Sequence, residues 1–455
     1  MQGRRWGTGS GRGFGIRGVG GAPAAAREED QAGVESGHGR PSQIRARVGA
    51  KRFPQRRIGE QGPPPIGALA FVGRRRSLRL FPRVVSILDM KYLAVCLLGL
   101  SIASSVAQAD WSEGMKMGTV RLKSVGPIAF GPEGILLIAD TKAASVVALK
   151  TTDEAAEADP KFRVEAVDEL IALVLGATAE DILIEDMAIH PTSRAAYLSV
   201  WRGRGPDGLP LIVRVGSNGN PEVVAMDYVL HSVAELPDAP IDGVVGQGRR
   251  ASNPRQESIT DIAFFQDRVL VAGLANEEFA STFRAIPFPF ETVEGGSSVE
   301  IFHGAHGRFE TRAPIRTFVP MNIGSEPSLL AAYTCTPLVQ FPISDVTPGA
   351  KIQGKTIAEL GNRNRPLDMV VYQKDGVDYL LLANSSRGVM KIATGGIEGA
   401  EKIEERVSEE RAGVGYETIA SWSGVLQLDL LGDSHAVTLR DVDEGRLVLE
   451  ALPLP

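Results

Sequence analysis

"DMVVYQKDGVDYLLLANSSRG", residues 368–388, decides the fold of this chain. It reads as a short strand led by Asp368, a Lys-Asp-Gly turn, and an apolar second strand that ends in a polar loop. Lys-Asp-Gly is typical of a hairpin, because Gly readily adopts the positive φ that tight turns require. The Leu-rich second strand has the composition of a strand buried on both faces. The stretch therefore predicts one strand–turn–strand unit with a third strand after the loop.

Equivalent units recur along the chain. "DMAIHPTSRAAYLSVWRGRG" begins at Asp186 and "DIAFFQDRVLVAGLANEEFAS" at Asp261, whereas "PIAFGPEGILLIADTKAAS" from Pro127 lacks only the leading Asp. "SLLAAYTCTPLVQFPI" from Ser328 matches the second and third strands. Short strands with repeated turn signals are typical of a β-propeller, and the uneven spacing predicts insertions.

The predicted fold class is all-β, a β-propeller of six or seven blades with a short helical insertion. The units lie near residues 120–150, 186–216, 258–290, 312–345, 364–393 and 415–450, and a seventh has room within 220–250. In "AVDELIALVLGATAEDILI" (166–184) the apolar positions follow helical spacing, which predicts a helix near 167–177.

Two segments carry a resemblance to a known group of proteins. "IAFGPEGILLIAD" (128–140) and "MAIHPTSRAAYLSV" (187–200) resemble the strand–turn–strand unit of NHL-type and gluconolactonase-like six-bladed propellers. The resemblance implies a divalent cation at the channel mouth, held by Glu, Asn and Asp side chains. It places Asn276 and Asn384 where loop Asn ligands would lie, with Asp261 as a carboxylate ligand. Oxygen ligands of this kind suit calcium. The first unit has no evident counterpart of the group's leading Glu.

The composition changes near Met90. Residues 1–89 are rich in Arg, Gly and Pro and hold 17 Lys and Arg against 6 Asp and Glu, which predicts a disordered basic extension. "MKYLAVCLLGLSIASSVAQAD" then gives a Lys, an apolar run and Ala-Gln-Ala, the pattern of a signal peptide over residues 90–109. The apolar run is shorter than the roughly 20 residues of a membrane span. We expect translation to start at Met90, with 1–89 a misassigned start. The alternative is a real basic tail before a membrane anchor.

The expected mature chain, residues 110–455, would be secreted or periplasmic. It holds 31 Lys and Arg against 49 Asp and Glu, a net charge of about −18. So acidic a surface argues against nucleic acid and anionic membranes as partners. Cys335 is the only cysteine left, so no internal disulfide can form and the apolar core must hold the fold together.

Three leading aspartates are the predicted catalytic residues. Asp186, Asp261 and Asp368 occupy the same place in their units, which predicts that they lie near the central channel. A carboxylate there can act as a general base. The alternative is structural, since Asp side chains often bond nearby backbone in turns.

A polar loop is the predicted ligand site. "IAELGNRNRPLDM" (357–369) contains Arg363, Asn364 and Arg365, and two Arg in a loop fixed by Pro can clamp a carboxylate or phosphate. We add three residues of the loops that follow second strands, namely Asn384, Arg387 and Cys335. The alternatives are an Arg–Asp network bracing adjacent blades and, for Cys335, a buried apolar filler.

A second polar segment has metal-ligand spacing. His303, His306 and Glu310 in "FHGAHGRFETRAP" follow the pattern His-x2-His-x3-Glu. Imidazole and carboxylate groups bind transition metals. The alternative is a surface loop whose charged side chains are solvated or paired.

Two functions fit these patterns. The first is an exported binding or scaffold protein that holds a small anionic or sugar-like ligand, or a protein partner, at one face of the disc. The second is a divalent-cation-dependent hydrolase or lactonase, in which the metal polarises a carbonyl and an Asp acts as base. Because propellers carry many unrelated functions, the fold cannot choose between the two.

Overall fold

The computed structural model describes residues 110–153, 163–205, 207–248, 251–335, 337–443 and 445–455. The predicted basic extension (1–89) and signal peptide (90–109) lie outside the described residues, so both stay predictions. The described residues belong to one compact unit.

The strands of the described chain form six sheets, each named here by its innermost strand. The β2 sheet contains β2 (Ile128–Phe130), β3 (Ile135–Asp140), β4 (Ser145–Lys150), β10 (Val229–Glu235) and β1 (Lys116–Gly118). The β6 sheet contains β6 (Ile182–Ile189), β7 (Ala196–Arg202), β8 (Leu209–Val215) and β9 (Pro221–Val223). The β11 sheet contains β11 (Asp261–Phe265), β12 (Arg268–Leu274), β13 (Ser281–Pro287), β14 (Ser297–His303) and β15 (Arg308–Glu310), and β19 (Lys351–Gln353) pairs with β14.

The other three sheets follow the same plan. The β16 sheet contains β16 (Thr317–Ile323), β17 (Glu326–Ala332), β18 (Pro337–Pro342), β20 (Lys355–Glu359) and β24 (Ala412–Gly413). The β21 sheet contains β21 (Pro366–Lys374), β22 (Val377–Asn384), β23 (Gly388–Ala393) and β25 (Glu417–Thr418). The β26 sheet contains β26 (Val425–Leu431), β27 (His435–Asp441), β28 (Leu447–Pro453) and β5 (Arg163–Val164).

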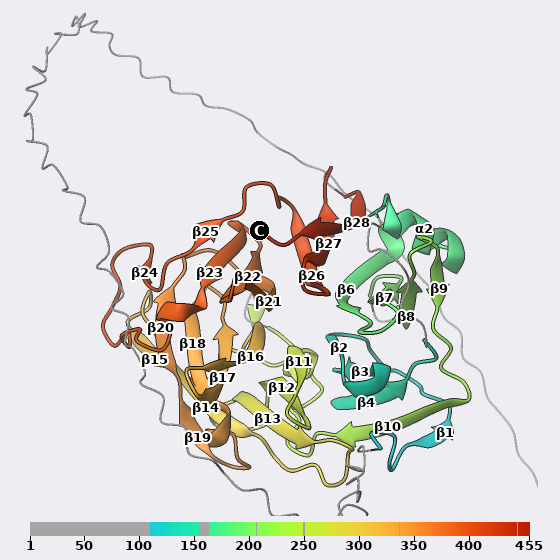
Figure 1. The fold of residues 1–455 in the computed structure, drawn as a ribbon. Coiled ribbons are helices and arrows are strands. Elements are labelled where there is room, and N and C mark those ends of the chain that lie inside the picture. The colour runs from blue at the N-terminus through green and yellow to red at the C-terminus, as the bar shows by residue number, and fades with distance from the viewer. Residues whose placement is uncertain (1–109, 154–162, 206, 249–250, 336, 444) are drawn as a thin grey trace, which may run out of the picture. The chain divides into compact units, whose positions relative to one another are not determined.

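These sheets are the blades of a six-bladed β-propeller, which confirms the predicted fold class. The inner strands contact one another in the closed order β2, β11, β16, β21, β26, β6 and back to β2 (Figure 1). The segment 220–250, which had room for a seventh unit, instead supplies the outer strands β9 and β10.

The chain does not visit the blades in ring order. After β4 it passes to the neighbouring β6 sheet and then returns as β10 to the outer side of the β2 sheet. On the way, β5 joins the β26 sheet by pairing with β28. A strand from the N-terminal part of the described chain therefore completes the C-terminal blade, and this pairing closes the ring.

Apolar side chains fill the spaces between neighbouring blades. Six buried clusters are present, and each combines residues of two adjacent sheets. Between the β16 and β21 sheets, for example, Leu330 of β17 packs in one cluster with Leu380 and Leu382 of β22. All six residues of β3 are buried, as expected for a second strand covered on both faces.

The hairpin turns have the predicted chemistry. Gln266 and Asp267 join β11 to β12 with φ of 46° and 62°, and Asp375 and Gly376 join β21 to β22 with φ of 53° and 77°. Two consecutive positive φ values define the tight turn that matches the twist of paired strands.

The predicted helix is present as α2 (Val167–Leu175). Its Val167 and Ile171 are fully buried against the β6 and β26 sheets, whereas Leu173 on the other face is 78% exposed. Gly176 ends the helix in the left-handed conformation, with φ of 61°. The short 3-10 turns are η1 (Pro132–Gly134), η2 (Ala179–Asp181), η4 (Pro254–Glu257), η5 (Ile343–Asp345) and η6 (Thr394–Gly396). No helix within the described ranges has the length and apolar character needed to cross a membrane.

Candidate functional site

A cavity of about 980 Å³ opens at one end of the central channel. Its walls come from the starts of the inner strands and from the loops β3–β4 and β7–β8. The residues that matter below are Lys142, Glu185, Asp186, Trp201, Glu257, Asp261, Arg316, Arg365 and Asp368. Small-molecule sites are typically concave and measure about 300–1,000 Å³, so this cavity has the size of a ligand site.

The three leading aspartates meet at this cavity, as their shared position in the repeat predicts. Each carboxylate bridges two neighbouring blades, because its Oδ2 accepts a backbone N–H from the next inner strand. The donors are Ile128 to Asp186 (2.7 Å), Phe318 to Asp261 (2.7 Å) and Leu428 to Asp368 (2.8 Å). The other oxygen of Asp261 and of Asp368 accepts the N–H of the following residue. The carboxylates predicted to be catalytic are therefore the same ones that hold neighbouring blades together.

Sequence reasoning missed a fourth aspartate of this kind. Asp429 accepts the N–H of Ile189 at 2.7 Å and that of Leu430 at 2.7 Å, so it joins β26 to β6. It does not line the cavity. The available signal was its place in "VLQLDLLGDSHAVTL" (425–439), where an Asp in an apolar strand precedes a Gly-Asp turn.

Burial raises the pKa of all four channel carboxyls. Loss of solvation raises the pKa of Asp261 to about 7 and that of Asp429 to about 6, although backbone hydrogen bonds act against the rise. The pKa of Asp186 and of Asp368 lies well above the usual range, first because of burial and also because neighbouring aspartates repel a further negative charge. The four side chains keep partial exposure to the channel. Asp261 and Asp429 can therefore exchange protons near neutral pH.

Cationic side chains stand around the same cavity. Among the described residues the guanidinium of Arg365 makes no hydrogen bond or ion pair. Its pKa is lowered, because it is partly buried and because Arg316 is close. Arg316 is itself paired with Glu257 at 2.7 Å. Arg365 is thus a cation at the cavity whose guanidinium is left for an external anion.

A cation and an aromatic ring face each other on another wall. The Lys142 ammonium lies 4.8 Å from the centre of the Trp201 ring. This cation–π pair joins loop β3–β4 to strand β7. On the Arg365 side, burial raises the pKa of Glu185, and the charge of Arg365 partly offsets the rise.

A hydrogen-bonded clamp holds the Arg365 loop in place. Asn364 donates its side-chain N–H to Asn384 Oδ1 at 3.0 Å, and its own Oδ1 accepts the N–H of Ser386 at 3.1 Å. Asn384 in turn donates to the Leu382 carbonyl at 2.9 Å. Both Asn side chains are buried. The polar loop after β22 thus positions the loop before β21.

The other predicted ligand-binding residues do not line the cavity. Arg387 pairs with Glu410 and donates to the Asn362 carbonyl at 3.2 Å. Arg363 is exposed, with a positive φ of 57°. Cys335 is half-buried, and its N–H donates to the Asn364 carbonyl at 2.7 Å. Of the six predicted ligand-binding residues, Arg365 is the one at the cavity, while Asn364 and Asn384 support it.

The structure does not gather the predicted cation ligands at the cavity. Asp261 lines it, but Asn276 and Asn384 do not. Asn276 is exposed, and the Asn384 amide is used in the clamp. Sequence position placed both Asn residues in equivalent loops, but it could not show that the partner of Asn384 is Asn364.

A scan against protein-family models finds no match, and a search of curated proteins finds none either. A search of solved structures finds matches at low similarity. One is a putative oxidoreductase (glucose dehydrogenase) from Thermus thermophilus, with 13% identity, a TM-score of 0.29, and coverage of 74% of this chain and 100% of that chain. Another is the PQQ-bound form of an aldose sugar dehydrogenase from Streptomyces coelicolor, with 10% identity, a TM-score of 0.25, and coverage of 74% and 98%.

A third is the β-propeller domain of Myceliophthora thermophila Cps50 (Swd1), with 10% identity, a TM-score of 0.29, and coverage of 74% and 99%. Values this low carry no argument about function. The class that the fold and the site define is a six-bladed β-propeller with a polar cavity at one end of its channel.

Proposed function

We propose that this propeller is a binding protein for a small, anionic, sugar-like ligand at the mouth of its channel. The observation that carries the proposal is the free guanidinium of Arg365 at the cavity, on a loop clamped by Asn364 and Asn384. A positioned guanidinium binds a carboxylate or phosphate through two parallel hydrogen bonds. Clamping the loop in advance lowers the ordering cost of binding.

The other walls suit the hydroxyl groups of such a ligand. Asp186, Asp261 and Asp368 each keep acceptor capacity beyond their backbone hydrogen bonds, because a carboxylate oxygen has two lone pairs. Trp201 adds an aromatic side chain to the wall of the cavity, and Lys142 over its ring adds positive charge. A protein partner that presents an acidic side chain to Arg365 is the second form of the binding proposal.

Calorimetric titration of the full chain with glucuronate, glucose 6-phosphate and glucose tests the proposal. We expect the two anionic sugars to bind at least about 10-fold more tightly than glucose, since a hydrogen bond to a charged group contributes about 1.5–3 kcal/mol. Arg365→Gln should remove this preference. Arg268→Gln, at an exposed Arg outside the cavity, is the matched control and should leave it unchanged. Equal affinity for all three sugars would reject an anion site.

A hydrolase is the second candidate function, because three carboxyls with raised pKa face one cavity. Acid–base catalysis at neutral pH requires groups of this kind. Hydrolysis of glucono-δ-lactone, followed with CaCl₂ and with EDTA, is the assay. The Asp261→Asn variant should lose activity while Asp429→Asn keeps it, since Asp429 makes the same type of bridge outside the cavity. Equal losses would identify a structural effect.

We also propose that the protein is exported. The support is the signal-peptide pattern of residues 90–109. Cell fractionation followed by N-terminal sequencing should find the chain outside the cytoplasm, beginning at Asp110. A cytoplasmic chain that retains residues 90–109 would contradict this proposal and leave the binding site unaffected.

A further inference from the structure

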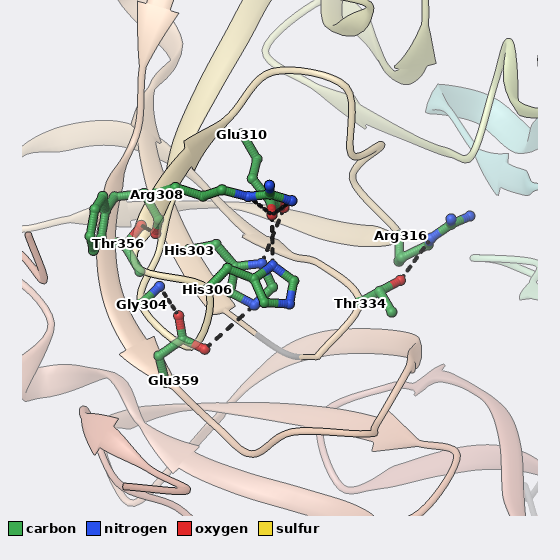
Figure 2. Close-up of polar contacts among 10 residues, drawn as sticks. His303, Gly304, His306, Arg308, Glu310, Arg316, Thr334, Thr356 and Glu359 are labelled. Atoms are coloured by element: carbon green, nitrogen blue, oxygen red, sulfur yellow. Dashed lines mark hydrogen bonds and ion pairs between the residues drawn. The ribbon is translucent and has the colours of Figure 1, made fainter. Parts of the chain in front are cut away.

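Four ionisable side chains cluster away from the channel, where the outer parts of the β11 and β16 sheets meet. His303 ends β14, His306 lies in the following turn, Glu310 ends β15, and Glu359 ends β20 (Figure 2). One potential ligand atom from each of His303, His306 and Glu310 lies within 4.8 Å of the others. None of the four residues lines the channel cavity.

Glu310 orients both imidazole rings. Its Oε2 is 3.1 Å from Nδ1 of His303, and its Oε1 is 2.7 Å from Nδ1 of His306. Arg308 also donates to Oε1, at 3.4 Å, as expected for an ionised, acceptor-only carboxylate. With Glu310 ionised, both Nδ1 atoms carry the hydrogen, and each imidazole in its neutral form then has a free lone pair on Nε2.

Nε2 of His303 lies on the side of Glu359 (Figure 2). The two rings are side by side, with centroids 3.9 Å apart, between Glu310 and Glu359 (Figure 2). Nε2 of His303 and Oε2 of Glu359 are buried, have no hydrogen-bond partner, and lie 3.9 Å apart. His303 and Glu359 are each only 2% exposed. Two buried acceptors that face each other without a donor between them are costly unless a cation binds both.

We propose that this cluster binds one divalent transition-metal ion, Zn²⁺ being the best fit, through Nε2 of His303 and Oε2 of Glu359, with the adjacent His306 as third ligand. Glu310 is a positioning residue that holds both rings through Nδ1. Metal-binding histidines commonly donate their other N–H to a carboxylate in this way. The spacing His-x2-His-x3-Glu pointed to Glu310 as a ligand; in the proposed site that place belongs to Glu359, 49 residues further along the chain, whose Oε2 is 3.9 Å from Nε2 of His303.

The distances and the ligand types suit zinc. Two ligand atoms of a tetrahedral zinc ion lie about 3.4 Å apart when each bond is about 2.1 Å long. The observed 3.9 Å between His303 and Glu359 is therefore about half an ångström from that geometry. Two imidazoles favour zinc over calcium or magnesium, which prefer oxygen ligands only. The His306 side chain is 46% exposed, so solvent can reach the ion and supply a fourth ligand.

Bound metal would join two blades. Glu359 already accepts the Gly304 N–H at 2.6 Å through its other oxygen, and an ion would add a second connection between β20 and the β14–β15 turn. Because the intact site exists in the folded chain alone, metal should raise the unfolding temperature.

The test uses the full chain, purified without a polyhistidine tag and freed of metal with a chelator. Calorimetric titration with ZnCl₂ should show one saturable site, and the unfolding temperature should rise with added zinc. Titration with CoCl₂ should produce the visible absorption bands of tetrahedral cobalt. The result expected for Glu310→Gln is a weaker affinity by about 10- to 100-fold, since it removes an orienting carboxylate.

Two variants that remove ligands and one control complete the test. His306→Ala and Glu359→Gln should each abolish the cobalt bands and the zinc-dependent rise, while circular dichroism confirms that the variants fold. His435→Ala, on the distant β27, should bind zinc like the wild type. Failure of the wild type to bind zinc saturably would overturn the proposal. Equal binding by all four variants would place the ion elsewhere and would overturn it as well.

Discussion

At the scale of the residue, the channel aspartates act as struts between blades, and in Asp261, Asp368 and Asp429 both carboxylate oxygens accept backbone N–H groups. Asp429 illustrates the consequence, since it accepts from Ile189 of the next blade and from Leu430 of its own strand. An Asn at this place would turn an NH₂ group towards one of these donors. A protonated Asp keeps both bonds, because the hydroxyl oxygen still has a free lone pair. Asp and Asn are therefore not equivalent here.

Replacement of Asp429 by Asn should lower the free energy of unfolding by about 1–3 kcal/mol, the cost of leaving a buried donor unsatisfied. Urea unfolding at about pH 4, where the stabilising contribution of Asp429 is complete, measures the change. Asp433→Asn is the control. Asp433 is an exposed turn residue, so this change should alter the free energy of unfolding by less than about 0.5 kcal/mol. If the Asp429→Asn variant were as stable as the wild type at that pH, the structural role of Asp429 would be refuted.

The raised pKa of Asp429 predicts how this difference depends on pH. The folded state binds the proton more tightly than the unfolded state, since the pKa is about 6 in the fold against a usual value of 3.8. The stabilising contribution is therefore complete below about pH 4 and is lost as the pH rises through about 6. The wild type should exceed Asp429→Asn in stability most at low pH, and the gap should narrow towards pH 7. A gap that widens with pH would contradict the raised pKa.

The sequence predicted the positions of three of the four bridging aspartates. Asp186, Asp261 and Asp368 lead units whose turns and second strands are regular, so their register could be read directly. Asp429 follows Val425-Leu426-Gln427-Leu428, where no leading Asp marks the start of the strand. In every case one donor lies on a different blade, and pairing between blades leaves no local pattern in the sequence.

At the scale of the element, the loop after β22 explains why an apolar strand ends in Asn384 and a run of polar residues. Asn384 reaches back across 20 positions to Asn364 and fixes the loop that carries Arg365. The sequence showed that these residues were polar and close to strand ends. It could not distinguish ligands for an external molecule from partners for each other, because the two roles require the same chemical groups.

Asn384→Ala should therefore destabilise the fold by about 1–3 kcal/mol and weaken binding at Arg365, because Asn364 loses its acceptor. Asn276→Ala should change neither, since Asn276 is exposed. Chemical unfolding and titration with glucuronate measure the two effects. Comparing Asn384→Ala with Asn276→Ala also distinguishes the hydrogen-bonded clamp from the predicted cation site. In the cation site both Asn residues would be equivalent ligands. Equal calcium-dependent losses in both variants would support the cation site instead.

At the scale of the whole molecule, stability depends on closing the ring of blades without a disulfide. The closing strand β5 contains two residues, Arg163 and Val164. Arg163 pairs with the buried Glu450, which also binds Arg440. Val164 is 5% exposed and packs in the cluster between the β6 and β26 sheets. The short strand thus adds both an ionic and an apolar contact to the last blade.

Val164→Asp should consequently lower the free energy of unfolding by about 3 kcal/mol or more, because it places an unpaired charge in that apolar cluster. Val223→Asp is the matched control, since Val223 belongs to the outermost strand of the β6 sheet but is 43% exposed. It should cost less than about 0.5 kcal/mol. Denaturant unfolding followed by Trp fluorescence compares the two variants. If β5 were a dispensable edge strand, both variants would unfold at the same denaturant concentration as the wild type. Ring closure by β5 requires that Val164→Asp alone loses stability.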